Sequence, residues 1–300
     1  MSKKILITGG TGLVGQRLVS MLQEEGHDVA ILSRTAGSKG TVKTYVWDIE
    51  NEYIDPEAFE QTEVIIHLAG AGVADKRWTA KRKETIYNSR VDSSSLLYNY
   101  LKSNDHQVKT FIAASAIGLY GDDTGSSLIQ EDAPTGKDFL AQVVDAWENA
   151  TNKVSSLGIR LFQPRIGIVL SAKGGALQEL LKPPVAAPLG SGDQYMSWIH
   201  IEDLCRMILF GIENEKISGP YNAVGPNPKT NQEFTKVAAK TMGKLYLPIA
   251  VPKLVLKLIL GEMAQIVLGG SRISAEKVLA SGFSFKFPQL DKALEDLKSA

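Results

Sequence analysis

The stretch ILITGGTGLVG at residues 5–15 constrains the fold of this chain more than any other segment. Its first apolar residues predict a buried strand, and apolar residues after the turn recur at helical spacing. Gly9 would let the chain turn sharply out of the strand, Gly12 would let a pyrophosphate approach the backbone, and Gly15 would let the helix pack closely on the strand. The segment therefore predicts a strand, a glycine turn and a helix that together cradle a phosphate.

The helix that follows the turn strengthens this prediction. The backbone amides of Leu13 and Val14 would point at the phosphates from a helix N-terminus, where the helix dipole favours negative charge. A glycine-rich turn that binds no ligand is the alternative interpretation, and the strand–turn–helix context argues against it.

Composition excludes several classes of function. The 300 residues include 33 basic and 33 acidic side chains, and no basic tract is interleaved with aromatics, so we expect no nucleic-acid partner. The single cysteine, Cys205, lies in an apolar run and is expected in the core, which excludes a disulfide framework. Because the N-terminus enters a strand directly, without a signal peptide, a cytoplasmic location is expected.

The most apolar stretch spans residues 247–268, and prolines and charged residues interrupt it. This spacing predicts an amphipathic helix that packs on a protein core, not a membrane span, so no membrane partner is expected. A position on a membrane surface is the alternative.

Short apolar runs alternate with helical patterns along the chain. Such alternation predicts an α/β protein with a Rossmann-type, doubly wound parallel sheet and a smaller mixed α/β C-terminal substrate lobe. We place the dinucleotide-binding domain at 1–170 and the substrate lobe at 171–300, with segments near 195–223 returning to the sheet. The expected strands are 4–8, 28–32, 42–47, 63–68, 108–114 and 160–169. The expected helices are 12–25, 79–103, 137–157, 201–213, 230–242, 252–268 and 274–280.

The end of the second expected strand indicates which dinucleotide is bound. An acidic residue there would bind the ribose 2′-hydroxyl of NAD and repel a 2′-phosphate. The strand instead ends at Ser33 and Arg34, and Lys39 follows in the same loop. Because a guanidinium suits phosphate, the sequence favours NADP(H) over NAD(H). The alternative is that Arg34 is an ordinary solvated loop charge.

The fourth expected strand ends in His67, Leu68, Ala69 and Gly70. The small residues after the histidine would allow a cofactor to lie across the strand ends, so Leu68, Ala69 and Gly70 are predicted to contact it. His67 is expected to be a packed strand-end histidine.

Several motifs together resemble the NAD(P)-dependent epimerase/dehydratase family, within the extended short-chain dehydrogenases/reductases. They are GGTGLVG, HLAG, NSRVDSSSLL, ASAIGLYG, WIHIEDL and GPYNAVGPNPKTNQEF, and their order covers nearly the whole chain. The details are most similar to an uncharacterised epimerase-like subgroup with a C-terminal segment of unassigned function.

The resemblance implies a serine, tyrosine and lysine that act on the substrate oxygen. Ser115 matches the serine, although its spacing to Tyr120 is one residue off the commonest pattern. Phe139 stands where the tyrosine is expected and Val143 where the lysine is expected, and neither side chain can transfer a proton.

Other polar residues are candidates for the site. Arg90 is predicted to reach the cofactor, and Tyr120, Arg165 and His200 are predicted to line the substrate pocket. A structural histidine is the alternative for His200.

Two functions remain open at this point. One is an NADP-dependent epimerase or oxidoreductase acting on an unknown small, sugar-like substrate, with Ser115 polarising the carbonyl and water or another side chain moving the proton. The other is a non-catalytic NADPH-binding sensor or regulator. The resemblance also implies that a homodimer could form.

Overall fold

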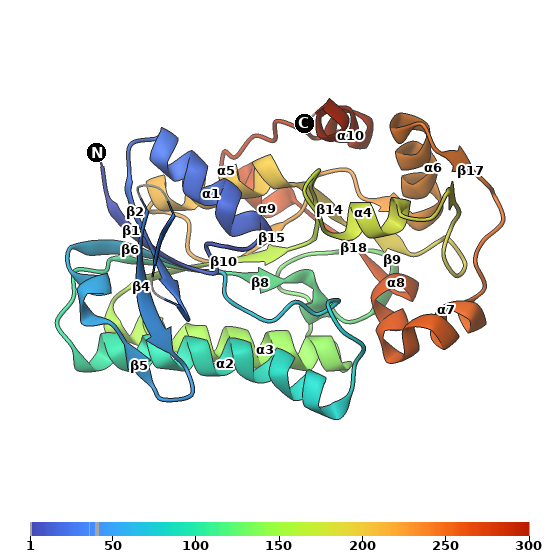
Figure 1. The fold of residues 1–300 in the computed structure, drawn as a ribbon. Helices are drawn as coiled ribbons and strands as arrows, with labels where there is room; N and C mark the ends of the chain where they lie inside the picture. Colours follow the sequence, from blue (N-terminus) through green and yellow to red (C-terminus); the bar gives the residue numbers. More distant parts are fainter. Residues whose placement is uncertain (1, 36, 40–41, 300) are drawn as a thin grey trace.

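A twisted and mainly parallel sheet forms the centre of the protein (Figure 1). The computed structural model describes residues 2–35, 37–39 and 42–299. In spatial order the strands are β15 (Gly219–Ala223), β10 (Arg160–Ile166), β7 (Thr110–Ala113), β6 (Thr62–His67), β1 (Lys4–Thr8), β2 (Asp28–Ser33), β4 (Val42–Asp48) and β3 (Gly37–Lys39). Only β3 is antiparallel to its neighbour in this order. The Rossmann-type fold class predicted from the sequence is therefore confirmed.

The strand order reverses direction at β1. The chain passes from β1 to β2 on one side and later returns to β6 on the other, so Thr8 pairs with Leu32 and with His67. Such a switch point opens a crevice at the carboxyl ends of the strands, where open α/β sheets bind their ligands. The glycine turn lies directly at this edge.

Two pairs of helices cover the faces of the sheet. α1 (Leu13–Glu24) and α5 (Ile201–Glu213) pack together on one face, whereas α2 (Ala80–Ser103) and α3 (Phe139–Asn152) pack together on the other (Figure 1). Each face has its own buried apolar cluster, which explains why β6 and β7 have uninterrupted apolar sequences. Because α5 and β15 belong to this layered structure, residues 201–223 lie on the first lobe.

The C-terminal third forms a smaller mixed lobe around a third apolar cluster that includes Trp198 and Phe234. The helices of this third of the chain are α4 (Ala176–Leu181), α6 (Asn231–Met242), α7 (Lys253–Leu260), α8 (Gln265–Leu268), α9 (Glu276–Ala280) and α10 (Leu290–Ser299). Of these, α9 packs through Val278 into the apolar cluster on the sheet face covered by α1 and α5. The short strands of the lobe are β11 (Ile168–Leu170), β12 (Val185–Ala186), β13 (Tyr195–Met196), β14 (Trp198–His200), β16 (Lys229–Thr230), β17 (Leu245–Tyr246) and β18 (Gly270–Ile273).

The remaining short elements are β5 (Tyr53–Ile54), β8 (Ser115–Ala116) and β9 (Asp123–Ile129), with 3₁₀ turns at Pro56–Phe59, Ile117–Tyr120, Lys153–Leu157 and Gly261–Ala264. β9 pairs with β18 and so joins the C-terminal segment to the first lobe. The sequence analysis missed β9 because its strand is polar and largely exposed.

Two expected elements are wrong in extent. The strand expected at 160–169 breaks at Gly167, where an added Cβ would lie 2.4 Å from the Ser197 carbonyl oxygen, and the chain leaves the main sheet to form β11. The helix expected at 252–268 breaks at Gly261, whose φ is +62°. The prediction that this helix packs on a protein core is also wrong for α7, since Leu256 is its only buried residue. Within the described ranges, no helix is long and apolar enough to cross a membrane.

Candidate functional site

The glycine turn between β1 and α1 has a backbone geometry that excludes side chains. Gly9 has a φ of +71°, and a Cβ there would lie 2.8 Å from the Leu68 carbonyl carbon. A Cβ at Gly15 would lie 2.3 Å from the Gly9 oxygen, while the Gly12 amide donates to that oxygen at 3.0 Å. Gly12 caps α1, so the amides of Leu13 and Val14 open the helix at the strand edge. This arrangement fits a pyrophosphate cradle.

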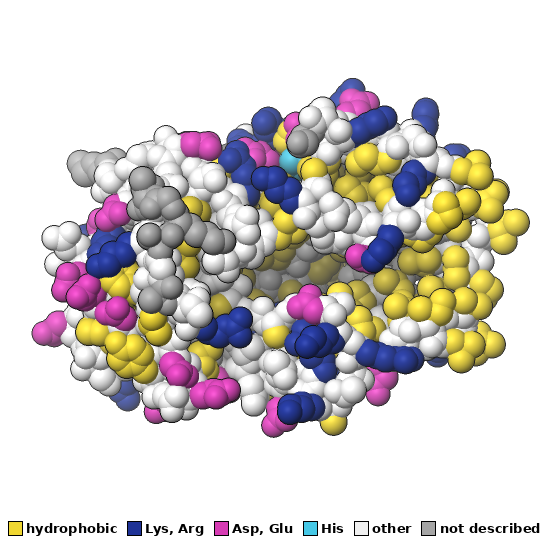
Figure 2. All heavy atoms as spheres, viewed as in Figure 1, with side chains coloured by type: hydrophobic (Ala, Val, Ile, Leu, Met, Phe, Trp, Pro, Cys, Tyr) yellow, Lys and Arg dark blue, Asp and Glu magenta, His cyan; other side chains and the backbone are white. Residues whose placement is uncertain are grey.

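The segment after β6 forms the adjoining wall of the crevice. The Leu68 amide donates to the Thr8 carbonyl at 3.1 Å and the Ala69 amide donates to the Thr8 hydroxyl at 3.2 Å, so Gly70 begins a loop beside the glycine turn. Figure 2 shows a hollow in the middle of the molecule, in the region where α1 and β8 lie in Figure 1.

His67 lies under this wall and is a structural residue. Its Nδ1 lies 2.7 Å from the Thr8 hydroxyl and its Nε2 lies 3.1 Å from the Ser94 hydroxyl. Complete burial, with Arg90 nearby, lowers the pKa of His67 to about 3. The imidazole is therefore neutral at physiological pH, as expected for a packed strand-end histidine.

Arg90 presents a cation against the same wall. It lies on α2 with its guanidinium carbon 3.1 Å from the position that a Cβ on Gly70 would occupy. It donates to the carbonyls of Ala71 and Ile86, each at 3.0 Å, and forms no ion pair within the part of the chain that the structure describes. Burial, with neighbouring Arg82, lowers the pKa of Arg90 to about 10. Its guanidinium carbon also lies 5.2 Å from the centroid of the Trp147 ring. A partly buried guanidinium that contacts carbonyls and a ring can still accept an anionic partner.

The residues predicted to select the cofactor lie at the end of β2. Ser33 is half-buried, and Arg34 is exposed directly after the strand. The side chain of Lys39 lies outside the described residues. Arg34 is thus free to point toward a ligand at the strand edge, and its predicted role stays a prediction.

The positions of the family tyrosine and lysine are filled by packing residues. Phe139 meets the Trp78 ring edge-on with centroids 5.1 Å apart, and Val143 is buried beside Trp78 and Ile86. The ammonium of Lys83 lies 5.2 Å from the centroid of the Phe139 ring and pairs with Glu262 of the C-terminal segment. The structure thus places one titratable group, Lys83, against the ring that replaces the tyrosine.

Ser115 is turned into a buried polar network beneath the crevice. Its hydroxyl donates to Glu148 Oε1 at 2.5 Å, and Arg165 donates to both carboxylate oxygens of Glu148 at 2.8 and 2.9 Å. Arg165 also donates to the Tyr120 hydroxyl at 2.8 Å, and that hydroxyl donates to Asn222 Oδ1 at 2.6 Å. The network joins β8, α3, β10 and β15.

These contacts show how two predicted pocket residues and the predicted catalytic serine are held, and their roles stay predictions. Arg165 and Tyr120 are 6% and 5% exposed, and their polar atoms are bound within the network. Burial raises the pKa of Tyr120 to about 12; burial alone would lower the pKa of Arg165, but Glu148 raises it. The structure brings both residues together with Ser115, but facing inward. Ser115 therefore does not present a free hydroxyl to a substrate.

His200 lies apart from this group. It caps α5 by accepting from the Glu202 amide at 3.1 Å, packs on Phe287 and lies 3.4 Å from Asp296 of α10. Burial lowers its pKa. These contacts give His200 a structural role in joining α5 to α10, which is the alternative that the sequence left open, and its place in a substrate pocket stays a prediction.

Sequence reasoning missed Glu148 and Lys83. Glu148 lies on the buried face of α3 with Ala141, Val144 and Thr151, and a lone acid on an apolar helix face was the available signal. Lys83 gave no such signal, because it lies in the run AKRKE at the exposed start of α2.

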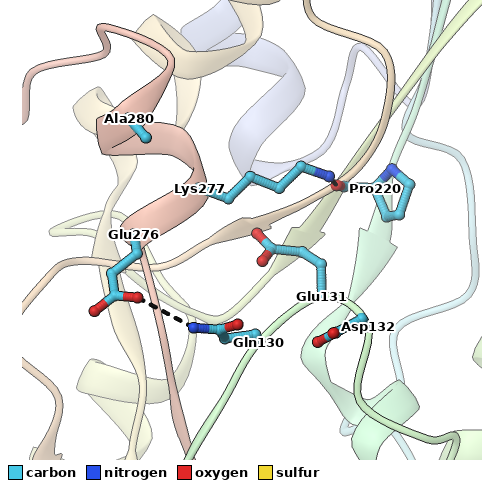
Figure 3. A pocket seen from close by; sticks show the side chains of 7 residues that line it. All are labelled: Gln130, Glu131, Asp132, Pro220, Glu276, Lys277 and Ala280. Carbon is cyan, nitrogen blue, oxygen red and sulfur yellow. Dashed lines mark hydrogen bonds between the residues drawn. The ribbon is translucent and has the colours of Figure 1, made fainter.

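A cavity of about 550 Å³ lies elsewhere, between the end of β9, the start of β15 and α9 (Figure 3). Its lining mixes acidic side chains with Lys277, whose ammonium donates to the Pro220 carbonyl at 2.6 Å. None of the predicted site residues lines it, so we do not assign it to the nucleotide.

Comparison with known proteins agrees with this geometry. The model of the NAD dependent epimerase/dehydratase family matches residues 5–144, and a domain of unknown function (DUF1731) matches residues 251–297. An epimerase family protein of Staphylococcus aureus (strain MRSA252) is 38% identical over 300 residues, which cover 99% of each chain. An epimerase family protein of Staphylococcus epidermidis is 36% identical over 304 residues, covering 99% of this chain and 100% of the relative. The chain belongs to this epimerase family, which binds a nicotinamide cofactor.

Solved structures show the same fold. The human epimerase family protein SDR39U1 (isoform 2) with NADPH superimposes with a TM-score of 0.90 at 27% identity, covering 99% of both chains. A nucleoside-diphosphate sugar epimerase from Corynebacterium glutamicum gives a TM-score of 0.78 at 30% identity, covering all of this chain and 59% of the other.

We predict that Glu148 and Arg165 are strongly coupled in stability. Glu148→Gln or Arg165→Met alone should each cost about 3–5 kcal/mol, because each leaves a buried charge unpaired. The double variant should cost less than the sum of the two. Urea unfolding of the four proteins measures this, and Ser115→Ala, which removes one neutral donor, should cost only about 1 kcal/mol. Additive losses would show that the pair is not coupled.

His67 should make stability fall with acidity. Its pKa is lowered to about 3 in the folded protein, while an unfolded chain titrates near the ordinary value of about 6.5. Between these values only the unfolded state takes up the proton, so from pH 7 to pH 5 the free energy of unfolding should fall by about 2 kcal/mol. His67→Asn should flatten the pH dependence by that amount in urea unfolding at each pH. An unchanged slope would contradict the assignment.

Proposed function

We propose that this protein binds NADP(H) in the crevice at the carboxyl edge of the sheet and acts on a small, sugar-like substrate. The observation that carries the proposal is the cradle around Gly9, Gly12 and Gly15, where an added Cβ at Gly9 or Gly15 would strike backbone. Selection against side chains at such positions is expected where a backbone must approach a pyrophosphate.

The preference for the phosphorylated cofactor rests on Arg34 at the end of β2, where no acid repels a 2′-phosphate. Arg90 adds a second cation without a carboxylate partner beside Gly70. The human relative was solved with NADPH, whereas a UDP-glucuronic acid 4-epimerase of the same fold from Bacillus cereus was solved with NAD, so the proposal rests on the chemistry of these two arginines.

The proton for a reaction has to come from outside the usual triad. A bound nicotinamide supplies hydride transfer at its C4 atom. Among the chain's own groups, Lys83 Nζ holds an exchangeable proton beside the Phe139 ring, and Glu262 keeps it oriented. We assign Lys83 the role of proton donor to the substrate oxygen.

A second function is favoured by a different observation. Ser115 donates to buried Glu148, and Phe139 and Val143 cannot transfer a proton. A cofactor cradle with all three triad positions withdrawn from chemistry suits an NADPH sensor or regulator without turnover. The homodimer expected from the family stays a prediction under either function.

The cofactor preference is tested with Arg34→Gln. The native protein should bind NADPH about tenfold or more tighter than NADH, and the variant should lose this difference, because a charge-assisted bond to the 2′-phosphate is removed. Titration of NADPH and NADH fluorescence measures both constants. Arg272→Gln, at the exposed position of β18, is the matched control and should leave both unchanged. Equal affinities in the native protein would refute the NADP(H) preference.

Turnover separates the two functions. With a panel of carbonyl substrates, the enzyme proposal expects NADPH oxidation that Lys83→Met lowers about a hundredfold or more, with NADPH affinity retained. The double variant Phe139→Tyr with Val143→Lys is the comparison. Tight NADPH binding with no turnover in the native protein, and activity only in the double variant, would establish the sensor and reject the enzyme.

A further inference from the structure

One end of the molecule carries most of its exposed large apolar side chains. Of the 12 such residues among the described ranges, 8 lie within residues 245–266. Figure 2 shows hydrophobic side chains gathered at the right-hand end, where Figure 1 places α6, β17 and α7. We call the following set the apolar tip: Leu245, Leu247, Ile249, Leu254, Val255, Leu258 and Ile259.

α7 exposes this apolar face because only one side of the helix packs against the rest of the protein. Leu256 is 7% exposed and faces the protein, whereas Leu254, Leu258 and Ile259 are 70%, 71% and 67% exposed. A helix whose leucines project into solvent on this scale, rather than one at a time, marks a surface that something else covers.

The tip also lies in a long stretch of the chain that carries charge of one sign. From Phe234 to Gly261 the sequence has lysines at 236, 240, 244, 253 and 257 and no acidic residue, although the whole protein is neutral. Lys253 and Lys257 form a stripe on α7 next to the stripe of Leu254 and Leu258. On the neighbouring loop, Arg77 donates to the Leu258 carbonyl at 3.3 Å, which adds a further cation. Glu262, the next acid along the chain, is paired with Lys83.

The exposed apolar side chains and the lysines together indicate what kind of partner covers the tip. A second copy would bring two cationic faces together, which like-charge repulsion opposes. A protein partner is usually anchored by exposed aromatic residues, and none of the tip's exposed side chains is aromatic. Projecting aliphatic side chains flanked by lysines suit the boundary between anionic headgroups and acyl chains. We propose that the apolar tip docks the protein on an anionic lipid surface, with α7 lying along it.

This proposal is independent of the cofactor and of turnover. The four tip residues of α7 lie in the C-terminal domain of unknown function, residues 251–297, and the basic side chains of the tip are not those of the cofactor cradle. It revises the expectation that no membrane surface is a partner, because that expectation assumed that a protein core covers the helix.

The test is flotation of the full-length protein with vesicles of phosphatidylcholine alone and with vesicles that also contain phosphatidylglycerol. The native protein should float with the anionic vesicles and not with the neutral ones, and binding should weaken as salt is raised. Lys253→Gln with Lys257→Gln should weaken binding about tenfold or more. Leu254→Gln with Leu258→Gln should weaken it by at least about tenfold, because the leucines no longer bury apolar area.

Matched controls keep the charge and apolar losses comparable. Lys102→Gln with Lys153→Gln removes two exposed lysines elsewhere, and Leu279→Gln removes an exposed leucine of α9. Both controls should bind like the native protein, and thermal unfolding should show all variants folded. Equal binding to neutral and anionic vesicles, absence of binding to either, or light scattering that shows a dimer lost in the leucine variant would each overturn the proposal.

Discussion

The bidentate pair between Glu148 and Arg165 connects the parts of the structure on which the site depends. It joins α3 on one face of the sheet to β10 within it, and through Ser115 it reaches the strand that ends beside the crevice. Tyr120 and Asn222 extend the connection to β15. Because Glu148 and Arg165 are buried together and hydrogen-bonded to each other, removing either one would leave the other as an unpaired buried charge. The floor of the crevice is therefore fixed by electrostatics as well as by packing.

That network also describes the surroundings of the three positions at which the family resemblance implies a serine, a tyrosine and a lysine. Ser115 occupies the position of the family serine, but its hydroxyl donates to Glu148. Phe139 and Val143, at the other two positions, pack against α2. Restoring the tyrosine and lysine would put polar groups into the apolar cluster around Trp78 and Ile86. The wall at Phe139 and Val143 is therefore held by apolar packing, whereas the glycine cradle is held by backbone contacts.

Local patterns in the sequence sufficed for the cradle and the central sheet. The effect of Gly9, Gly12 and Gly15 depends on their own backbone. The unbroken apolar sequences of β6 and β7 indicate that these strands are buried. The fate of Arg165 could not be predicted this way, since an arginine at a strand end points to a ligand or to an acid with equal ease. Its acid lies 17 residues away on another element. The strand β9 was not predicted, because its pairing with β18 depends on backbone hydrogen bonds and its sequence has no apolar pattern.

Helix α7 shows a further limit of what a sequence pattern can predict. Its periodicity correctly indicates an amphipathic helix near residues 252–260, but periodicity says only that one face is apolar and not what covers it. In the structure Leu256 faces the protein, whereas the larger apolar stripe of the helix is exposed to solvent. The segment that follows α7 also reaches α2, because Glu262 forms an ion pair with Lys83. A charge-free apolar face would call for a second copy or a protein, and it is the accompanying lysines, without a single acid over that span, that turn the argument toward an anionic surface.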